Sequence, residues 1–326
     1  MKKRFVNISL LVVVIGLHAC YYDLDLEKYR PAPTVVLNAV ASPDTLIMAR
    51  VCLTTFFADS SIFKDIEDAE VKLYVNKAYR EQLKWEKAGG IYVSSITPQA
   101  SDEIKLEVNS SYGNVWAEDI VPYKVNIEKI ETAGRKIKGP ESIYANPDGS
   151  YTIEDSELYV ITYSITFKDN PADTNYYCIR IEDDNPLLPV GTVDYSDEPV
   201  FIEQNSTINS LFSGTIEGQG GRTFSDKLFN GKTYTLMITE TVNSTFYDYY
   251  ADILNRKILL YSLSKSYYNY LTSLLNIDEN SIEYYLSEYG LYEPVKTFSN
   301  IQGGAGILAT SQVDIKTVDL KELFPE

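Results

Sequence analysis

The sequence is nearly without histidine. Its 326 residues contain a single one, His18, which lies within the first twenty positions. A Ser-His-Asp triad, a cysteine–histidine pair and a histidine zinc site all require imidazole. If the segment before residue 20 is removed during export, the mature chain has none of these sites. Paired carboxylates, or calcium held by oxygen ligands, stay compatible with the composition.

Cysteine is almost as scarce, with Cys20, Cys52 and Cys178 the three present. Cys52 and Cys178 lie 126 positions apart, each inside a strand-like run. Two alternatives stay open for this pair: a disulfide in an oxidising compartment, or two semi-buried thiols that never meet, which we favour. Their spacing matches no metal motif, and we expect neither a metal nor a cofactor.

Basic residues are also outnumbered: the chain has 29 basic and 46 acidic residues, and its formal net charge is −17. Residues 1–19 carry three basic residues and no acid, so their removal takes the charge to −20. A chain this acidic does not bind nucleic acid by neutralising phosphates, nor an anionic membrane by charge. Contact with lipid must then come from an anchor.

The N-terminus has the features of an export signal. Three positive charges precede an apolar run over residues 8–17, which is too short to span a bilayer as a mature helix. Residues 17–20 (LHAC) resemble the lipobox of bacterial lipoproteins, whose cysteine is acylated and becomes the first mature residue. We expect residues 1–19 to be a signal peptide and Cys20 to be lipidated, which attaches the protein to a membrane through acyl chains. An ordinary signal peptide with a chance cysteine, or an uncleaved anchor, is the alternative.

Residues 20–33 are interpreted as an acidic tether, since two prolines and several charges disfavour regular structure. Asp23, Asp25 and Glu27 resemble the signal that sends lipoproteins of Bacteroidetes to the cell surface. The expected location is therefore the outer membrane, lipid-anchored and surface-exposed. A merely solvated linker is the other interpretation.

The rest of the chain is expected to be mainly β, with two β-sandwich domains. Apolar residues alternate with polar ones in short runs separated by turn residues, which is typical of antiparallel sheets with one buried face. We place an N-terminal sandwich at residues 34–122 and a C-terminal β-rich domain at residues 123–326. The clearest strand has Tyr159, Ile161, Tyr163, Ile165 and Phe167 on one face.

A small α-helical insertion is predicted at about residues 264–290. Tyr267, Tyr270, Leu271 and Leu274 recur at helical spacing, with Ser264 or Ser266 as a cap. Tyrosine offers a large, stiff contact surface with a polar end, which suits recognition. The candidate ligand- or partner-binding residues are the tyrosines of this insertion: Tyr267, Tyr268, Tyr270, Tyr284, Tyr285 and Tyr289. Tyrosine also suits half-buried strands, so a packing role is the alternative.

Two acidic loops, at residues 182–185 and 194–198, offer oxygen atoms that calcium prefers. The regular alternation and the glycine of an EF-hand loop are missing. We interpret both loops as solvated turns rather than metal sites.

Several short segments, taken in their order along the chain, resemble the DUF4249 family, which consists of lipoproteins of Bacteroidetes with no assigned reaction. They are residues 66–73 (IEDAEVKL), 104–108 (IKLEV), 175–177 (NYY), 224–231 (FSDKLFNG), 266–271 (SYYNYL) and 299–307 (SNIQGGAGI). The resemblance covers about residues 30–310. It implies a first domain similar to immunoglobulin-like or transthyretin-like sandwiches, and an accessory role beside a TonB-dependent transporter. It carries over no catalytic residue.

The expected function is non-enzymatic: a lipid-anchored surface lipoprotein that binds a ligand or protein partner as an accessory to a TonB-dependent transporter. A structural or adhesive envelope protein without a small ligand is the main alternative. A carboxylate-dependent glycosidase is a remote one, since it needs two acids suitably spaced in a cleft.

Overall fold

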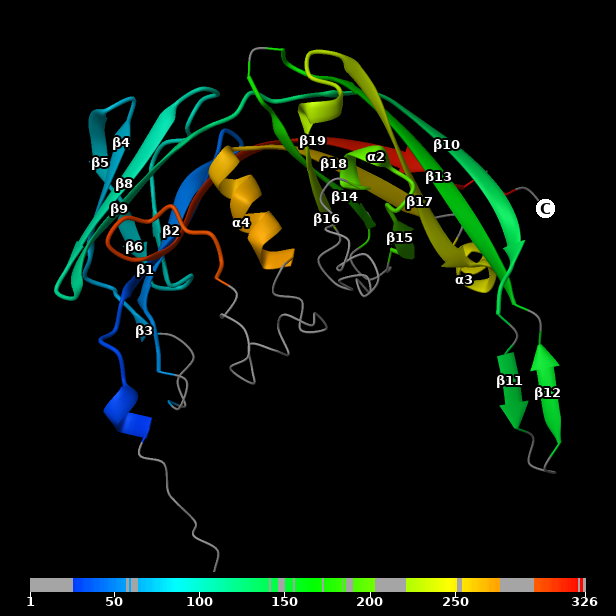
Figure 1. Ribbon diagram of the computed structural model, residues 1–326, viewed down its shortest axis with the longest axis horizontal. Helices are drawn as coiled ribbons and strands as arrows, with labels where there is room; N and C mark the ends of the chain where they lie inside the picture. Colours follow the sequence, from blue (N-terminus) through cyan, green and yellow to red (C-terminus); the bar gives the residue numbers. More distant parts are fainter. Residues whose placement is uncertain are drawn as a thin grey trace, which may run out of the picture.

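The computed structural model describes residues 26–56, 59, 64–140, 142–145, 150–154, 156–171, 173–183, 185, 190–202, 221–250, 254–275, 296–321 and 323–324. The chain is mainly β, and the strands build two β-sandwiches that stand side by side as the two limbs of an arch (Figure 1). The predicted fold class is confirmed. Cys20 and the predicted signal peptide lie outside the described residues.

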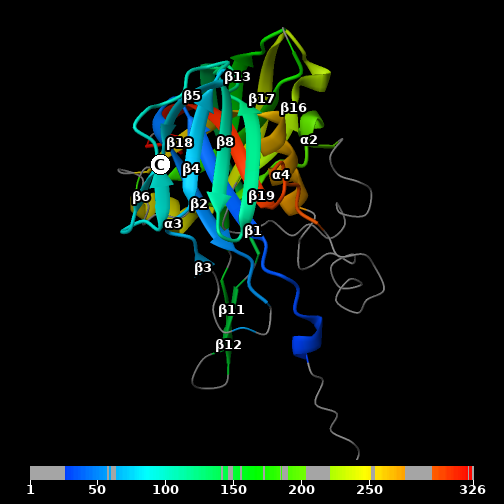
Figure 2. The same ribbon diagram turned by 90° about the vertical axis from the view of Figure 1, so that its left-hand side faces the viewer.

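The first sandwich follows from the alternating pattern after residue 34, because every second residue turns to the space between two layers. One layer contains β1 (Val35–Ser42), β2 (Thr45–Leu53), β7 (Ile91–Val93), β6 (Lys84–Glu86) and the first part of β19 (Ala305–Asp319), with β3 (Lys64–Asp65) paired to β2. The other layer has the order β5 (Ala78–Gln82), β4 (Glu70–Val75), β8 (Glu103–Ser110) and β9 (Gly113–Ile120). Figure 2 shows the second layer from outside.

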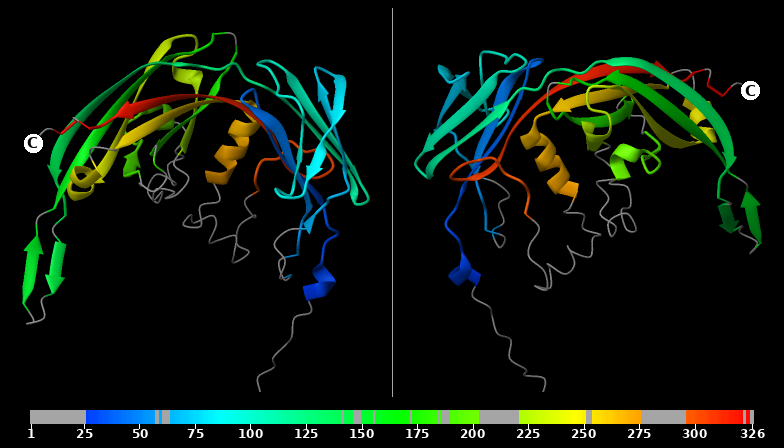
Figure 3. Two further views of the ribbon diagram at one scale, coloured as in Figure 1. Left: turned by 180° about the vertical axis from the view of Figure 1, so that it is seen from behind. Right: turned by 45° about the horizontal axis from the view of Figure 1, so that its top comes forward.

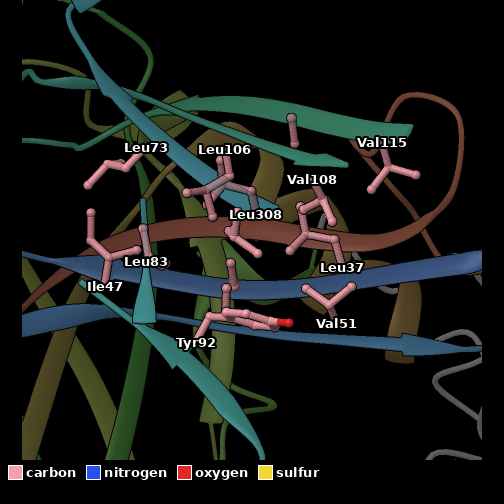
Figure 4. Packing of buried hydrophobic residues seen from close by; sticks show 14 of the residues in the cluster. Leu37, Ile47, Val51, Leu73, Leu83, Tyr92, Leu106, Val108, Val115 and Leu308 are labelled. Atoms are coloured by element: carbon pink, nitrogen blue, oxygen red, sulfur yellow. The ribbon is translucent and has the colours of Figure 1, made fainter. Parts of the chain in front are cut away.

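The core of the first sandwich is almost entirely aliphatic. Leu37 from β1, Leu73 from β4 and Leu106 from β8 are fully buried and meet between the layers (Figure 4). Tyr92 is the one aromatic residue in this buried set, and its hydroxyl donates to the carbonyl of Ile66 at 2.7 Å. The alternating apolar residues of the predicted N-terminal sandwich, Leu37, Leu73 and Leu106 among them, lie in this core.

The second sandwich pairs two further layers around a core rich in aromatic rings. One layer has the order β10 (Ile127–Lys138), β13 (Glu157–Lys168), β17 (Thr233–Asn243) and β15 (Thr192–Asp194). The facing layer contains β16 (Gly221–Ser225), β14 (Tyr176–Asp183), β18 (Asn255–Leu263) and the second part of β19. The predicted face of β13, from Tyr159 to Phe167, is buried in this core.

The helices within the described residues are short. They are α2 (Pro199–Ile202), α3 (Ser244–Tyr250), α4 (Lys265–Leu275) and the 3-10 turns η1 (Leu26–Tyr29) and η3 (Asp226–Leu228). A separate hairpin of β11 (Ser142–Ala145) and β12 (Tyr151–Glu154) extends from the far end of the second sandwich (Figure 1). Among the helices in the described ranges, none combines the length and the apolar character needed to cross a bilayer.

One strand, β19, belongs to both sandwiches. Its residues 305–310 run parallel to β1, and its residues 311–319 run antiparallel to β18. The sequence-based division assigned everything after residue 122 to the second domain, whereas the structure places Ile301 and Leu308 in the first core. Alternation identifies a strand but not its partner, which is why this sharing was not foreseen. The result is a nine-stranded sheet that continues through the whole arch.

Polar contacts lie on either side of the point where the chain crosses between the two sandwiches. The backbone N–H and the hydroxyl of Thr310 both donate to the Asp119 carboxylate at 3.0 Å. The Asp314 carboxylate accepts from the backbone N–H of Ile127 at 2.9 Å and pairs with Lys124 at 3.2 Å. We call this group of residues, Asp119, Lys124, Ile127, Thr310 and Asp314, the polar joint.

The cysteines of the two sandwiches do not pair. Cys52 lies on β2 in the first sandwich and Cys178 on β14 in the second, and both are buried free thiols. Burial raises the pKa of the Cys178 thiol to about 12, so it stays protonated and unreactive at neutral pH. The structure thus resolves the two alternatives in favour of separate thiols.

Candidate binding face on the inner side of the arch

The nine-stranded sheet has a second side, turned away from both cores and toward the inner side of the arch. On β14, Tyr177, Ile179 and Ile181 point into the second core, so the residues between them point to the inner side. Tyr176 and Arg180 are therefore displayed there. Helix α4 lies across this side of the sheet, as the views in Figure 3 show.

Helix α4 begins where the sequence predicted a cap. The Ser264 hydroxyl accepts the backbone N–H of Tyr267 at 3.1 Å, which satisfies one of the free donors of the first turn. Ser264 is itself tied to the sheet, because its N–H donates to the carbonyl of Thr310 at 3.0 Å. Near the other end, the Ser273 hydroxyl accepts the N–H of Phe298 at 2.8 Å. Both ends of the helix are thus fixed to neighbouring backbone.

Tyrosines from the helix meet tyrosines from the sheet. The rings of Tyr268 and Tyr176 lie with centroids 4.6 Å apart and an interplanar angle of 32°. Burial raises the pKa of Tyr267, whose hydroxyl lies near Cys178, Tyr261 and Arg180. We call Tyr176, Arg180, Tyr261, Tyr267 and Tyr268 the inner tyrosine cluster.

Arg180 is the one cation of the inner tyrosine cluster. Its Nη2 pairs with the Glu182 carboxylate at 2.9 Å, and its guanidinium also donates to the Tyr261 hydroxyl. Burial raises the pKa of Tyr261, so this tyrosine remains neutral and keeps both donor and acceptor character.

Three buried polar atoms around α4 have no hydrogen-bond partner among the residues that the structure describes. They are Nε of Arg180, Oγ1 of Thr223 on β16 and Oγ1 of Thr272 on the helix. Buried polar atoms without a partner are rare in folded proteins, because each one costs about 1–3 kcal/mol. Their concentration here marks a place where a bridging water or a partner group would complete the bonding.

Three of the candidate tyrosines fall in this region. Tyr267 and Tyr268 join the inner tyrosine cluster, and Tyr270 lies beside Tyr267 on the same helix. All three are half-buried. Tyr284, Tyr285 and Tyr289, with the second half of the predicted insertion, lie outside the described residues.

Sequence reasoning missed the half of the cluster that belongs to the sheet. Tyr176, Arg180 and Tyr261 carry a detectable signal, since each alternates with residues of an apolar strand face. On β14 the residues between the core positions include a tyrosine, a cysteine and an arginine rather than only small polar residues. That pattern is typical of a strand covered on both sides.

The acidic loops hold structural contacts. Asp183 pairs with Arg256 and accepts the backbone N–H of Asn185 at 2.7 Å, and Asp194 accepts the N–H of Ser196 at 2.8 Å. Glu198 accepts the Tyr234 hydroxyl and the N–H of Met237. Within the described ranges no three His, Cys, Asp or Glu side chains gather as metal ligands would.

Two clefts, of about 410 and 390 Å³, lie on the first sandwich. Trp85 and Tyr92 line one of them, and Arg80 and Asp102 line the other. Neither cleft includes a residue of the inner tyrosine cluster. The cluster itself is half-buried where α4 packs on the sheet.

Comparison with known proteins identifies a family. A search of curated proteins finds no match to this chain. A solved structure from Corynebacterium diphtheriae, described as a membrane anchored protein, aligns with 91% of this chain at 14% identity and a TM-score of 0.22. The chain spans 62% of the length of that protein, and a TM-score this low supports no inference. A family model described as Domain of unknown function (DUF4249) matches residues 21–317, so the protein belongs to the DUF4249 family.

Proposed function

We propose that this protein is a lipid-anchored lipoprotein of the outer membrane, displayed on the cell surface, that binds a protein partner without catalysing a reaction. The partner we propose is a TonB-dependent transporter, to which this protein is an accessory. The observation that carries the proposal is the inner tyrosine cluster, a half-buried aromatic group around one arginine with three unpartnered polar atoms beside it. Tyr and Arg side chains dominate the binding energy of many interfaces.

The anchor and the binding face fit together in one chain. The lipobox-like residues before Cys20 would attach the N-terminus to the membrane, and the tether would give the arch some reach. The shared strand β19 joins the two sandwiches in one continuous sheet. A preorganised face loses less entropy on binding than a flexible one, which favours a stable complex.

A non-enzymatic role is supported by what the buried carboxylates do. Glu240, Asp183 and Glu198 each accept hydrogen bonds from the protein itself, and Asp169 accepts from the Tyr177 hydroxyl and the N–H of Gly231. Carboxylates committed in this way are poor candidates for the paired acid and base of a glycosidase.

The partner is tested by affinity purification from crosslinked native membranes, comparing the wild type with Tyr268→Ala. The matched control is Tyr249→Ala, which removes a tyrosine that is 79% exposed on α3 and outside the cluster. We expect a TonB-dependent transporter to co-purify with the wild type and the control, and its recovery to fall about tenfold for Tyr268→Ala. Recovery of adhesin or fibre subunits instead would favour the structural alternative and contradict the proposal.

The anchor is tested separately, so that its failure is distinct from failure of the partner. Metabolic labelling with an alkyne fatty acid should mark the wild type and leave Cys20→Ala unlabelled. Protease treatment of intact cells should then digest the wild type. Digestion only after lysis would contradict surface display while leaving lipidation intact.

A further inference from the structure

The outer side of the first sandwich carries a row of rings that no part of the proposed function uses. Each of the four strands β5, β4, β8 and β9 contributes one residue to a line that crosses the sheet from edge to edge. The residues are Tyr79, Tyr74, Lys105 and Trp116, which we call the aromatic row. Figure 2 shows this side of the sheet.

Contacts between neighbours hold the aromatic row in place. The rings of Tyr79 and Tyr74 meet edge to face with centroids 5.7 Å apart. Lys105 Nζ lies 5.7 Å from the centroid of Tyr74 and 4.8 Å from that of Trp116, which makes it a cationic bridge between the two rings. Glu107 fixes this bridge, because it pairs with Lys105 at 2.7 Å and accepts the Tyr74 hydroxyl. The rings are thus positioned before any ligand arrives.

The ends of the aromatic row are accessible. Tyr79 is 55% exposed and Trp116 is 40% exposed, and on β9 the residues that alternate with Trp116 are buried. Strands in a sheet lie about 4.8 Å apart, so three spacings separate the ends of the row by about 14 Å. This length suits an extended chain of repeating units rather than one small molecule.

The charges beside the aromatic row argue for an uncharged ligand. Lys105 pairs with Glu107, and Lys72 pairs with Glu70 at 3.1 Å. Glu70 also accepts the side-chain amide of Asn109 at 3.0 Å. A charged ligand would have to break one of these pairs to gain its own partner, whereas hydroxyl groups can share these donors and acceptors without displacing a charge.

We propose that the aromatic row binds an uncharged polysaccharide chain. Sugar rings offer apolar C–H faces that stack on aromatic rings, and hydroxyls at their edges that bond to flanking amides and carboxylates. Trp116, Tyr74 and Tyr79 supply the stacking surfaces. Glu70, Lys72 and Asn109 supply the polar groups. The surface is separate from the inner tyrosine cluster, so it does not depend on a transporter partner.

The test is electrophoresis of the purified full-length protein through gels that contain a single polysaccharide. The neutral probes are amylopectin, arabinoxylan, galactomannan and mixed-linkage β-glucan, and the anionic probes are polygalacturonate and chondroitin sulfate. We expect at least one neutral probe to retard the wild type, with the retardation lost in Trp116→Ala and strongly reduced in Tyr79→Ala. Tyr249→Ala, which is outside the row, should migrate like the wild type.

A second readout uses the two tryptophans of the chain, Trp85 and Trp116. In a Trp85→Phe variant the emission comes from Trp116 alone, and a bound neutral polysaccharide should shift it to shorter wavelength and protect it from acrylamide quenching. The proposal is overturned if no neutral probe retards the protein, if only anionic probes do, or if Trp116→Ala leaves the retardation unchanged. Far-UV circular dichroism confirms that each variant is folded.

Discussion

The two sandwiches share a strand and a sheet but bury different kinds of side chain. The first core consists of Val, Leu, Ile and Ala with a single tyrosine, so its stability comes almost wholly from apolar burial. The second core combines aromatic rings with an ion group, in which Arg256 is fully buried beside Glu240 and Asp183. The two β-sandwiches are therefore stabilised by different interactions, apolar burial in the first and aromatic packing with a buried ion group in the second.

The ion group of the second core is fully hydrogen-bonded. Glu240 accepts Arg256 Nη2 at 2.7 Å, the Tyr163 hydroxyl at 2.7 Å and the backbone N–H of Gly191 at 2.7 Å. Burial alone would lower the pKa of Arg256, yet the hydrogen bonds and charge of Glu240 outweigh it and raise the pKa. A buried charge survives in this way only while each partner is present. The second sandwich should thus be less tolerant of single changes than the first.

Removing the cation of the second core should have the largest effect. Arg256→Met fills similar space but leaves the carboxylates of Glu240 and Asp183 without their cation. We expect the free energy of unfolding to fall by about 3–5 kcal/mol, measured by urea denaturation. Ile258→Val on the same strand is the matched control and should lose only about 0.5–1.5 kcal/mol. Equal losses for both variants would contradict a special role for the ion group.

Two optical signals report whether the destabilisation in Arg256→Met extends from the second sandwich to the first. Both tryptophans belong to the first sandwich, whereas most of the stacked tyrosines belong to the second. Because β19 is shared, we expect tryptophan fluorescence and tyrosine near-UV circular dichroism to shift together in Arg256→Met. A shift of the tyrosine signal alone would mean that the sandwiches unfold independently.

A truncation in the aliphatic core tests the other side of the comparison. Leu106→Ala removes a fully buried side chain between the layers of the first sandwich. We expect a loss of about 2–5 kcal/mol, with the value set by how far neighbours such as Leu37 and Leu73 close the cavity. We expect Leu106→Met to lower the free energy of unfolding by less than about 1.5 kcal/mol, because an aliphatic core tolerates changes of shape. A larger loss for the methionine variant than for alanine would contradict this account.

The local structure of both sandwiches was predictable, because it depends on residues close together in the sequence. Alternation located the strands that contain Leu37, Leu73 and Tyr163, and serine placement located the start of α4. Tyr267 and Tyr268 were also identified as candidates, since tyrosines cluster in the predicted helical insertion.

The contacts between distant segments were not predictable in the same way. Nothing in residues 305–319 indicates that one strand pairs with β1 and then with β18. Arg256 occupies an ordinary strand position in the sequence, and its burial becomes understandable only once Glu240 is seen opposite. The partner of Tyr268 lies on a strand whose inner side is defined by the fold, so the sequence signal of Tyr176 does not show which helix covers it.

The smallest effect is expected at the polar joint, where the two regions meet. Asp119→Ala removes the acceptor of both Thr310 hydrogen bonds and leaves a buried N–H unpaired, so we expect a loss of about 1–3 kcal/mol. Burial raises the pKa of Asp119 above its ordinary value of 3.8, although hydrogen bonds from Ser264 and Thr310 oppose the shift. The folded protein therefore holds this proton more tightly than the unfolded chain. The stability that Asp119 contributes is fully present below the ordinary pKa, and it decreases as the pH rises through the raised pKa of the folded state. We expect the difference in urea midpoint between the wild type and Asp119→Ala to be larger at pH 4 than at pH 7. A difference that instead grows toward pH 7 would mean that the carboxylate form of Asp119, not its protonated form, stabilises the joint.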